Sequence, residues 1–142
     1  METKSKTTIT VETIVNAPVE KVWEYWTKPQ HVTQWNHASD DWHTTYAEND
    51  FRPGGKFLSR MEAKDGSVGF DFSGVNDVIQ TNEYIEYTLD DDRKVWVTFT
   101  ADGHTTHVKE NFEAEETNSV PMQKGGWQAI LDNFKKYTEA TY

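Results

Sequence analysis

The sequence predicts an α+β fold in which a curved antiparallel sheet of about six strands wraps around a long C-terminal helix, with two short helices after the first strand. Three observations lead to this prediction. Apolar and polar residues alternate through successive short segments, which is the period of strands. Turn-forming residues separate these segments, and the C-terminal segment changes to the period of an amphipathic helix. We expect residues 1–142 to form one domain, with residues 1–6 as a flexible N-terminus.

The chain opens with a strand that is followed by two short helices. Residues 7–15 alternate apolar and polar side chains, which predicts a strand. Pro18 suits the first turn of a helix, where its missing N–H costs no hydrogen bond. Apolar residues then recur every three or four positions, so we expect a helix over residues 18–27. Pro29 breaks this helix, and a second short helix is expected over residues 29–35.

The middle of the chain predicts a meander of antiparallel strands. The turns between the strands are short and rich in glycine, asparagine and aspartate, which are the residues that hairpin turns favour. Four successive hairpins follow from this spacing. The expected strands cover residues 42–48, 56–63, 68–80, 84–89, 94–100 and 104–114.

A long amphipathic helix is expected over about residues 120–139. Ser119 or Asn118 can cap its N-terminus, and Pro121 fits its first turn. One face of this helix carries Trp127, Ile130, Leu131, Phe134 and Thr138. A helix cannot lie flat along a strongly curved sheet, so we expect the sheet to wrap around it and leave a cavity between them.

Composition and charge exclude several functional classes. Lys and Arg number 14 and Asp and Glu number 24, and the resulting charge of −10 opposes binding to nucleic acid or to anionic membranes. The absence of cysteine excludes disulfides, thiolate nucleophiles and Cys-ligated metal centres. No apolar run is long enough to span a membrane, and the first residues lack the apolar segment of a secretory signal. We therefore expect a cytoplasmic protein without membrane insertion.

Several motifs, in order and spacing, resemble those of a known superfamily. They are residues 16–23 (NAPVEKVW), Trp35, residues 51–57 (FRPGGKF), residues 73–75 (SGV), Gly126-Trp127 and Leu131. The chain resembles the START-like, or Bet v 1-like (SRPBCC), helix-grip superfamily, and is most similar to the group around the C-terminal domain of the activator of heat-shock protein 90 ATPase. The resemblance covers about residues 8–138. It implies a helix-grip fold and a function among hydrophobic-ligand carriers, polyketide cyclases, oxygenase domains and chaperone activators.

The function that we favour is the binding of a small, mostly hydrophobic ligand, such as a lipid or a polycyclic aromatic compound, between the sheet and the C-terminal helix. The candidate ligand-binding residues are Trp35, Trp42, Phe57, Met61, Phe70, Phe72, Trp127, Ile130, Leu131 and Phe134. The helix residues among them favour core packing over ligand contact and the strand residues fit either role, because core and cavity wall are one surface in this fold. We assign no catalytic residue and no cofactor.

Two other functions stay open. A cyclase- or hydrolase-type enzyme would use the same cavity and would need a buried carboxyl group with a raised pKa. Glu110, Glu113, Asp71 and Asp77 are the candidates for this group, and the sequence does not show which of them is buried. The resemblance also implies a chaperone-interacting module, whose acidic surface would suit a basic patch on the partner.

The segment over residues 35–43 mixes aromatic, histidine and acidic residues. His37, Asp41 and His43 are of the residue types that ligate metals. The segment is loop-like, however, and no ligand spacing supports a metal site there. We therefore assign no metal.

Overall fold

In residues 7–142, which are the part of the chain that the computed structural model describes, seven strands and three helices follow the predicted order. The helices are α1 (Val19–Thr27), α2 (Pro29–Trp35) and α3 (Val120–Thr141). The strands are β1 (Thr8–Val15), β2 (Trp42–Asn49), β3 (Lys56–Ala63), β4 (Gly69–Gln80), β5 (Tyr84–Leu89), β6 (Lys94–Asp102) and β7 (Thr105–Glu113). The expectation of a flexible N-terminus concerns residues 1–6, which lie outside the described residues.

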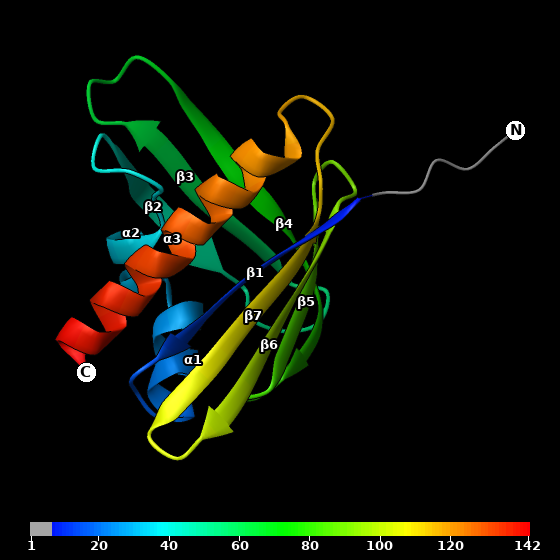
Figure 1. Cartoon of the computed structure of the whole chain (residues 1–142). Coiled ribbons are helices and arrows are strands. Elements are labelled where there is room, and N and C mark those ends of the chain that lie inside the picture. The colour runs from blue at the N-terminus through cyan, green and yellow to red at the C-terminus, as the bar shows by residue number, and fades with distance from the viewer. Residues whose placement is uncertain (1–6) are drawn as a thin grey trace, which may run out of the picture.

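The strands form one antiparallel sheet in the order β1-β7-β6-β5-β4-β3-β2. Strands β2 to β7 follow one another as the predicted meander, and β1 pairs with β7 at the far edge. The sheet curls, so that its two edges approach α3 from opposite sides (Figure 1). The α+β architecture of a sheet wrapped around the C-terminal helix is confirmed, with seven strands in the sheet.

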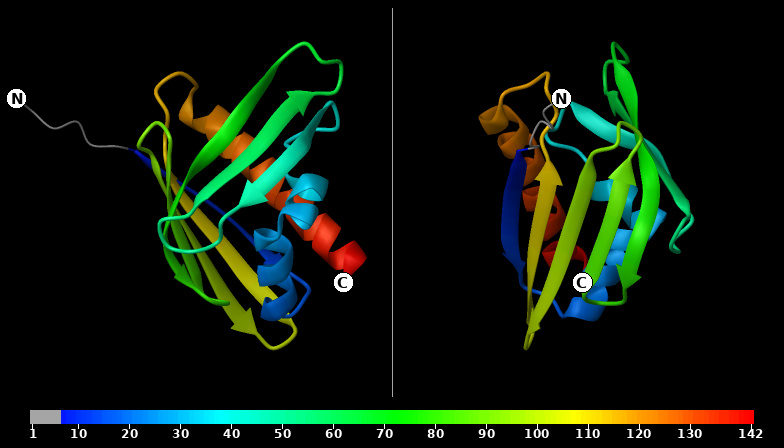
Figure 2. Two further views of the ribbon diagram at one scale, coloured as in Figure 1. Left: turned by 180° about the vertical axis from the view of Figure 1, so that it is seen from behind. Right: turned by 90° about the vertical axis from the view of Figure 1, so that its right-hand side faces the viewer.

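All three helices lie on the concave side of the sheet (Figure 2). Helix α3 runs along β1 and crosses the hollow of the sheet, and α1 and α2 lie near the C-terminal end of α3. Ser119 caps α3, because its hydroxyl accepts a hydrogen bond of 3.3 Å from the backbone N–H of Met122. Among residues 7–142, no helix is long and apolar enough to cross a membrane.

Strand β7 forms the floor of the hollow. Its residues alternate between buried and partly exposed, and the buried ones are Thr106, Val108, Glu110 and Phe112. The strands on either side present valines opposite Glu110, namely Val11 on β1 and Val97 on β6. One acidic residue therefore stands in a floor that is otherwise apolar or uncharged.

The turn between β2 and β3 is fixed against β4 by Asn76. The backbone of Asn76 exchanges hydrogen bonds with Gly54 and Gly55, and its side-chain amide donates to Asn49 Oδ1 at 3.0 Å. Gly55 admits no side chain, because a Cβ atom there would lie 1.9 Å from the carbonyl oxygen of Asp50. The motif at residues 51–57 thus closes one end of the hollow.

Candidate functional site

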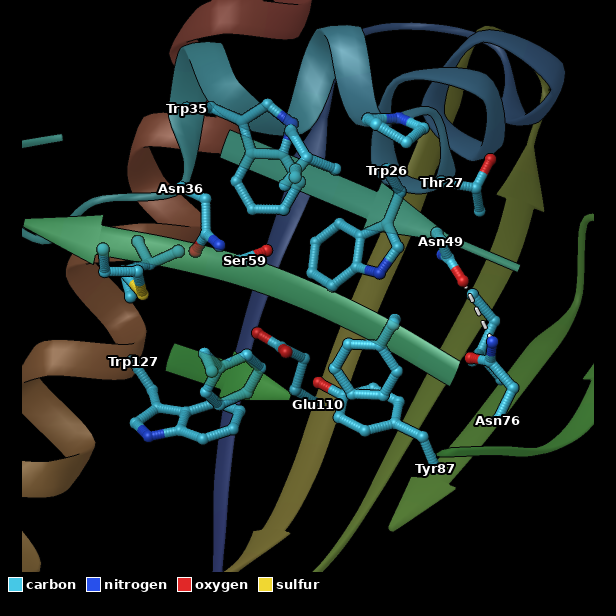
Figure 3. Close-up of a pocket in the computed structure, with 18 of the residues that line it drawn as sticks. Trp26, Thr27, Trp35, Asn36, Asn49, Ser59, Asn76, Tyr87, Glu110 and Trp127 are labelled. Atoms are coloured by element: carbon cyan, nitrogen blue, oxygen red, sulfur yellow. Dashed lines mark hydrogen bonds between the residues drawn. The ribbon is translucent and has the colours of Figure 1, made fainter. Parts of the chain in front are cut away.

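A cavity of about 290 Å³ lies between the concave face of the sheet, the N-terminal half of α3 and the two short helices (Figure 3). Its volume is just below the range of about 300–1,000 Å³ that is typical of small-molecule pockets. Most of its lining side chains are aromatic or aliphatic. The cavity therefore fits a compact, mostly apolar molecule.

Seven of the ten predicted ligand-binding residues line this cavity. They are Trp35, Phe57, Met61, Phe70, Phe72, Trp127 and Ile130. Leu131 and Phe134 are fully buried in the core and are not among the lining residues, and Trp42 packs beside Phe70 with ring centroids 5.9 Å apart. Contact of these residues with a ligand stays a prediction.

The cavity wall also contains residues that we did not predict from the sequence. Trp26, Tyr87, Phe51 and Ile85 all line it. The helical spacing of Trp26 puts it on the apolar face of α1, and this pattern could have identified it as a candidate for the cavity wall. Tyr87 carried no comparable signal, because its position depends on how far the sheet curls.

Five aromatic rings from five different elements form a continuous arc, which we call the aromatic arc. Its members are Phe112 (β7), Trp127 (α3), Phe72 (β4), Phe57 (β3) and Tyr87 (β5). Phe112 and Trp127 are stacked at 3.8 Å, and the following centroids are 6.0, 6.1 and 4.9 Å apart. Phe112 and Tyr87 end the arc, and Glu110 lies near both of them: Phe112 is on the same face of β7, and the charge of Glu110 acts on Tyr87.

Glu110 is the acid at the centre of the site. Its side chain projects into the cavity between Trp127 and Tyr87 (Figure 3), and the residue is only 5% exposed. No hydrogen bond or ion pair to its carboxyl group is present within residues 7–142. Burial raises the pKa of this carboxyl from its ordinary 4.5 to about 8, because no nearby positive charge compensates the loss of water. At pH 7 the carboxyl is therefore mainly protonated.

The other three candidate acids do not share this environment. Asp71 is exposed and pairs with Arg60 at 3.2 Å. Asp77 accepts a hydrogen bond from Thr88 at 2.6 Å. Glu113 accepts a hydrogen bond from a backbone N–H of β6 at 2.7 Å. Among the four candidates, Glu110 alone has the buried and unpartnered carboxyl that acid–base chemistry requires.

Two further polar residues lie close to Glu110. Burial and the charge of Glu110 raise the pKa of the Tyr87 phenol well above its usual 10, so the phenol stays protonated at neutral pH. Arg93 also lines the cavity, but its guanidinium is bound to Asp91 at 2.8 Å. Tyr87 thus adds a hydroxyl group to the site, while the positive charge of Arg93 is already paired.

The remaining polar groups of the lining are mostly committed to the protein. The Gln123 amide donates to two carbonyl oxygens, at 3.1 and 2.7 Å, and the Thr27 hydroxyl donates to the carbonyl of Trp23 at 2.8 Å. Asn76 is bound to the β2–β3 turn. The groups left for a ligand include Glu110, Tyr87, the Ser59 hydroxyl and the Asn36 amide.

The mixed segment over residues 35–43 lies at the entrance to β2. Within residues 7–142, no group of three or more His, Asp or Glu side chains is arranged to hold a metal ion. Burial is the largest cause that lowers the pKa of His37, and Asn133 donates a hydrogen bond to the backbone carbonyl of this residue at 2.5 Å. The segment thus attaches α3 to the end of α2.

Comparisons with known proteins agree with this architecture. Two similar solved structures are the AHSA1-like protein from Aeromonas hydrophila, with 42% identity and a TM-score of 0.89, and Chr148 from Cytophaga hutchinsonii, with 53% identity and a TM-score of 0.81. The first match covers 94% of this chain and 93% of the other, and the second covers 93% and 92%. CalU16 from Micromonospora echinospora shares the fold at 19% identity and a TM-score of 0.67, over 92% of this chain and 75% of the other. No curated protein matches the chain.

A family model identifies the group to which these similarities belong. The model described as "Activator of Hsp90 ATPase homolog 1-like protein" matches residues 16–139. This range contains α1, α2, all but the last two residues of α3 and six of the seven strands. The resemblance to the START-like, or Bet v 1-like, superfamily is thereby confirmed, and the chain is a member of the family of activator of Hsp90 ATPase homolog 1-like proteins.

Proposed function

We propose that this protein binds a small, mostly hydrophobic molecule in the cavity between the concave sheet and α3. The observation that carries the proposal is a cavity of about 290 Å³ whose wall includes four of the five rings of the aromatic arc and that contains one unpartnered acid, Glu110. Burial of apolar ligand surface supplies the affinity, at roughly 2.5 kcal/mol for each 100 Å². Glu110 and Tyr87 orient the ligand, as the few polar groups of such pockets do.

The size of the cavity narrows the ligand class. A volume near the lower limit of small-molecule pockets favours a compact molecule with one or two rings over an extended lipid chain. The ring faces of Trp127, Phe72 and Phe57 favour a planar or rounded apolar body that packs against them. We therefore place a compact cyclic compound ahead of a long-chain lipid. The cytoplasmic location expected from the sequence stays a prediction.

A cavity-filling variant tests this function. Ile130→Trp adds a ring to the cavity wall, whereas Ile14→Trp adds the same ring at an exposed position on β1. Titration with compact aromatic compounds, followed by amide NMR shifts, is expected to show binding to the parent protein and to Ile14→Trp but not to Ile130→Trp. Equal binding by both variants, with both folded, would contradict the proposed location.

Acid–base catalysis is a second candidate, and the environment of Glu110 favours it. A carboxyl group with a pKa of about 8 titrates near neutral pH, where a general acid or base is most effective. If the cavity turns over a bound compound, Glu110→Gln should lower kcat by about 10²-fold or more, because proton transfer of this kind contributes about 10²–10⁴-fold. Unchanged kcat in Glu110→Gln would remove this candidate.

A chaperone-interacting role is a third candidate, and the family match supports it. The acidic chain, with a net charge of −10, suits a basic surface on a partner. An ATPase assay of a heat-shock protein 90 with and without this protein tests the role. Stimulation that falls with added salt is expected, and an unchanged ATPase rate at a saturating amount of this protein would count against it.

A further inference from the structure

We propose that the cavity takes a small organic cation, an ammonium group on a compact apolar or aromatic body, which pairs with the Glu110 carboxylate inside the aromatic arc. This ligand class rests on the proposed binding function and specifies the charge of the ligand. A neutral ligand would leave the proposed function intact and remove the present inference.

The first support is a missing positive charge beside Glu110. The residue is 5% exposed, and its carboxyl has no hydrogen bond or ion pair within residues 7–142. The strands on either side present Val11 and Val97 opposite it. Buried acids in proteins are normally paired or hydrogen-bonded, and when this carboxyl ionises the described residues offer it no counter-ion. A cationic ligand supplies that counter-ion.

The second support is the arrangement of rings around the carboxyl. The aromatic arc runs from Phe112 through Trp127 and on to Tyr87. The face of an aromatic ring carries negative potential, and a cation within about 6 Å of a ring centroid is attracted to it, most strongly by Trp. The rings and the ionised carboxyl group therefore both attract a positive group. Figure 3 shows Trp127 and Tyr87 on opposite sides of Glu110.

The third support is the charge of the other lining residues. Glu48 and Glu115 also line the cavity, and the only basic residue in its described lining is Arg93, which is bound to Asp91. The whole chain carries a net charge of −10. A negative field of this kind raises the local concentration of cations and repels fatty acids, phosphates and other anions.

The pH dependence of binding distinguishes a cation from a neutral ligand. A permanent cation pairs with the ionised carboxyl, and burial holds the pKa of Glu110 at about 8. Raising the pH from 7 to 9 therefore increases the ionised fraction, and with it the affinity, about tenfold. The titratable or charged groups that face the same space are Tyr87, Arg93, Glu48 and Glu115, and the pKa of Tyr87 lies well above 10.

The experiment compares three probes of similar size. Phenyltrimethylammonium is a permanent cation, tert-butylbenzene is its neutral isostere, and acetophenone is a neutral hydrogen-bond acceptor. Affinities are measured by NMR titration at pH 7 and pH 9, for the parent protein and for Glu110→Gln, which keeps the shape of the side chain. Trp127→Leu serves as a second variant that removes the largest ring of the arc but keeps the acid.

We expect phenyltrimethylammonium to bind at pH 9 about tenfold or more tightly than tert-butylbenzene, and to lose about tenfold in affinity at pH 7. In Glu110→Gln the ratio of the two affinities should fall to the smaller value that the rings alone supply, and it should lose its pH dependence. In Trp127→Leu the cation should weaken but keep its pH dependence.

Three results would overturn the inference. Equal or tighter binding of tert-butylbenzene would show that the cavity prefers a neutral ligand, and the proposed function would stand. Tighter binding of acetophenone at pH 7 than of phenyltrimethylammonium at pH 9 would show that the site prefers a hydrogen-bond acceptor, held by protonated Glu110, to a cation. Absence of binding by all three probes would contradict both the inference and the proposed function.

Discussion

Two groups of aromatic residues in this molecule differ in what they enclose. One is the aromatic arc. The other, which we call the sealed cluster, centres on Phe99 and Phe134, which do not line the cavity, and includes Trp26 and Trp35, which pack against them and also border the cavity. Centroids in the sealed cluster are 4.8–5.8 Å apart, and Phe134 is fully buried. The rings of the arc also contact one another, but they curve around a cavity and an unpaired acid.

The difference lies in the polar groups rather than in the rings. In the sealed cluster the one polar atom of Trp35 is satisfied, since its indole N–H donates to the carbonyl of Tyr25 at 3.0 Å. In the arc, Glu110 has no such partner within the described residues. Aromatic residues are thus equally able to form a core or a binding site, and the buried polar group that they leave unpaired identifies the site.

The largest expected difference between the two groups is in stability. Phe134→Ala removes a fully buried ring from the sealed cluster and should lower the free energy of unfolding by about 3–5 kcal/mol. Phe72→Ala removes a partly exposed ring that borders existing space and should cost less than half as much. Chemical denaturation measures both, and equal losses would mean that the arc is packed as core.

The pH dependence of stability reports on the unpaired Glu110 carboxyl beside the aromatic arc. Below about pH 4.5 the Glu110 carboxyl is protonated in both the folded and the unfolded chain. Between pH 4.5 and about 8 the unfolded chain releases this proton and the folded chain keeps it, so the free energy of unfolding falls by up to about 1.4 kcal/mol per pH unit from this group. Above about pH 8 the carboxyl is ionised in both the folded and the unfolded chain, so its contribution to the free energy of unfolding no longer changes with pH.

Glu110→Gln should remove this contribution, and denaturation of both proteins at pH 5, 7 and 9 checks it. The variant should gain stability relative to the parent as the pH rises, because an amide at this position has no charge to desolvate. The matched control Glu20→Gln changes an exposed acid of α1. A parallel pH dependence in parent and Glu110→Gln would mean that the acid is solvated.

The smallest expected effect concerns the start of α3, beside the arc. A Cβ atom at Gly126 would meet no atom within 4 Å, and the residue is helical. Gly126→Ala should therefore raise the free energy of unfolding by about 0.5–1 kcal/mol, because alanine loses less conformational freedom in a helix. Thermal denaturation checks this gain, and a loss of stability would show that the glycine serves a close contact.

The secondary structure and the core were more predictable from the sequence than the site. Periodicity and turn residues located every helix and strand, because each of these signals is local. The apolar face of α3 was also predicted, but the sequence did not show which of its residues line the cavity and which enter the core. The N-terminal half, with Trp127 and Ile130, lines the cavity, whereas Leu131 and Phe134 enter the core. That division depends on how α3 crosses the curved sheet.

The position of Trp42 and the burial of Glu110 depend on long-range geometry as well. The pairing of β2 with β3 shifts between Thr44 and Tyr46, so alternation along β2 does not continue regularly from Trp42. Glu110 is buried because β1 and β6, which are distant in sequence from each other, place valines beside it. Its identity as a candidate acid was visible in the sequence, and its burial required the folded sheet.

The central claim is that the ligand binds in the cavity at the aromatic arc and Glu110, and that aromatic residues outside the cavity do not take part. The indole N–H signals of Trp127 and Trp96 report on this directly, because Trp127 lines the cavity and Trp96 alternates with buried valines on β6 and faces away from it. During an NMR titration with phenyltrimethylammonium at pH 9, the Trp127 signal should shift to saturation while the Trp96 signal stays in place. Equal shifts of both signals, or a Trp127 signal that does not move, would contradict the account.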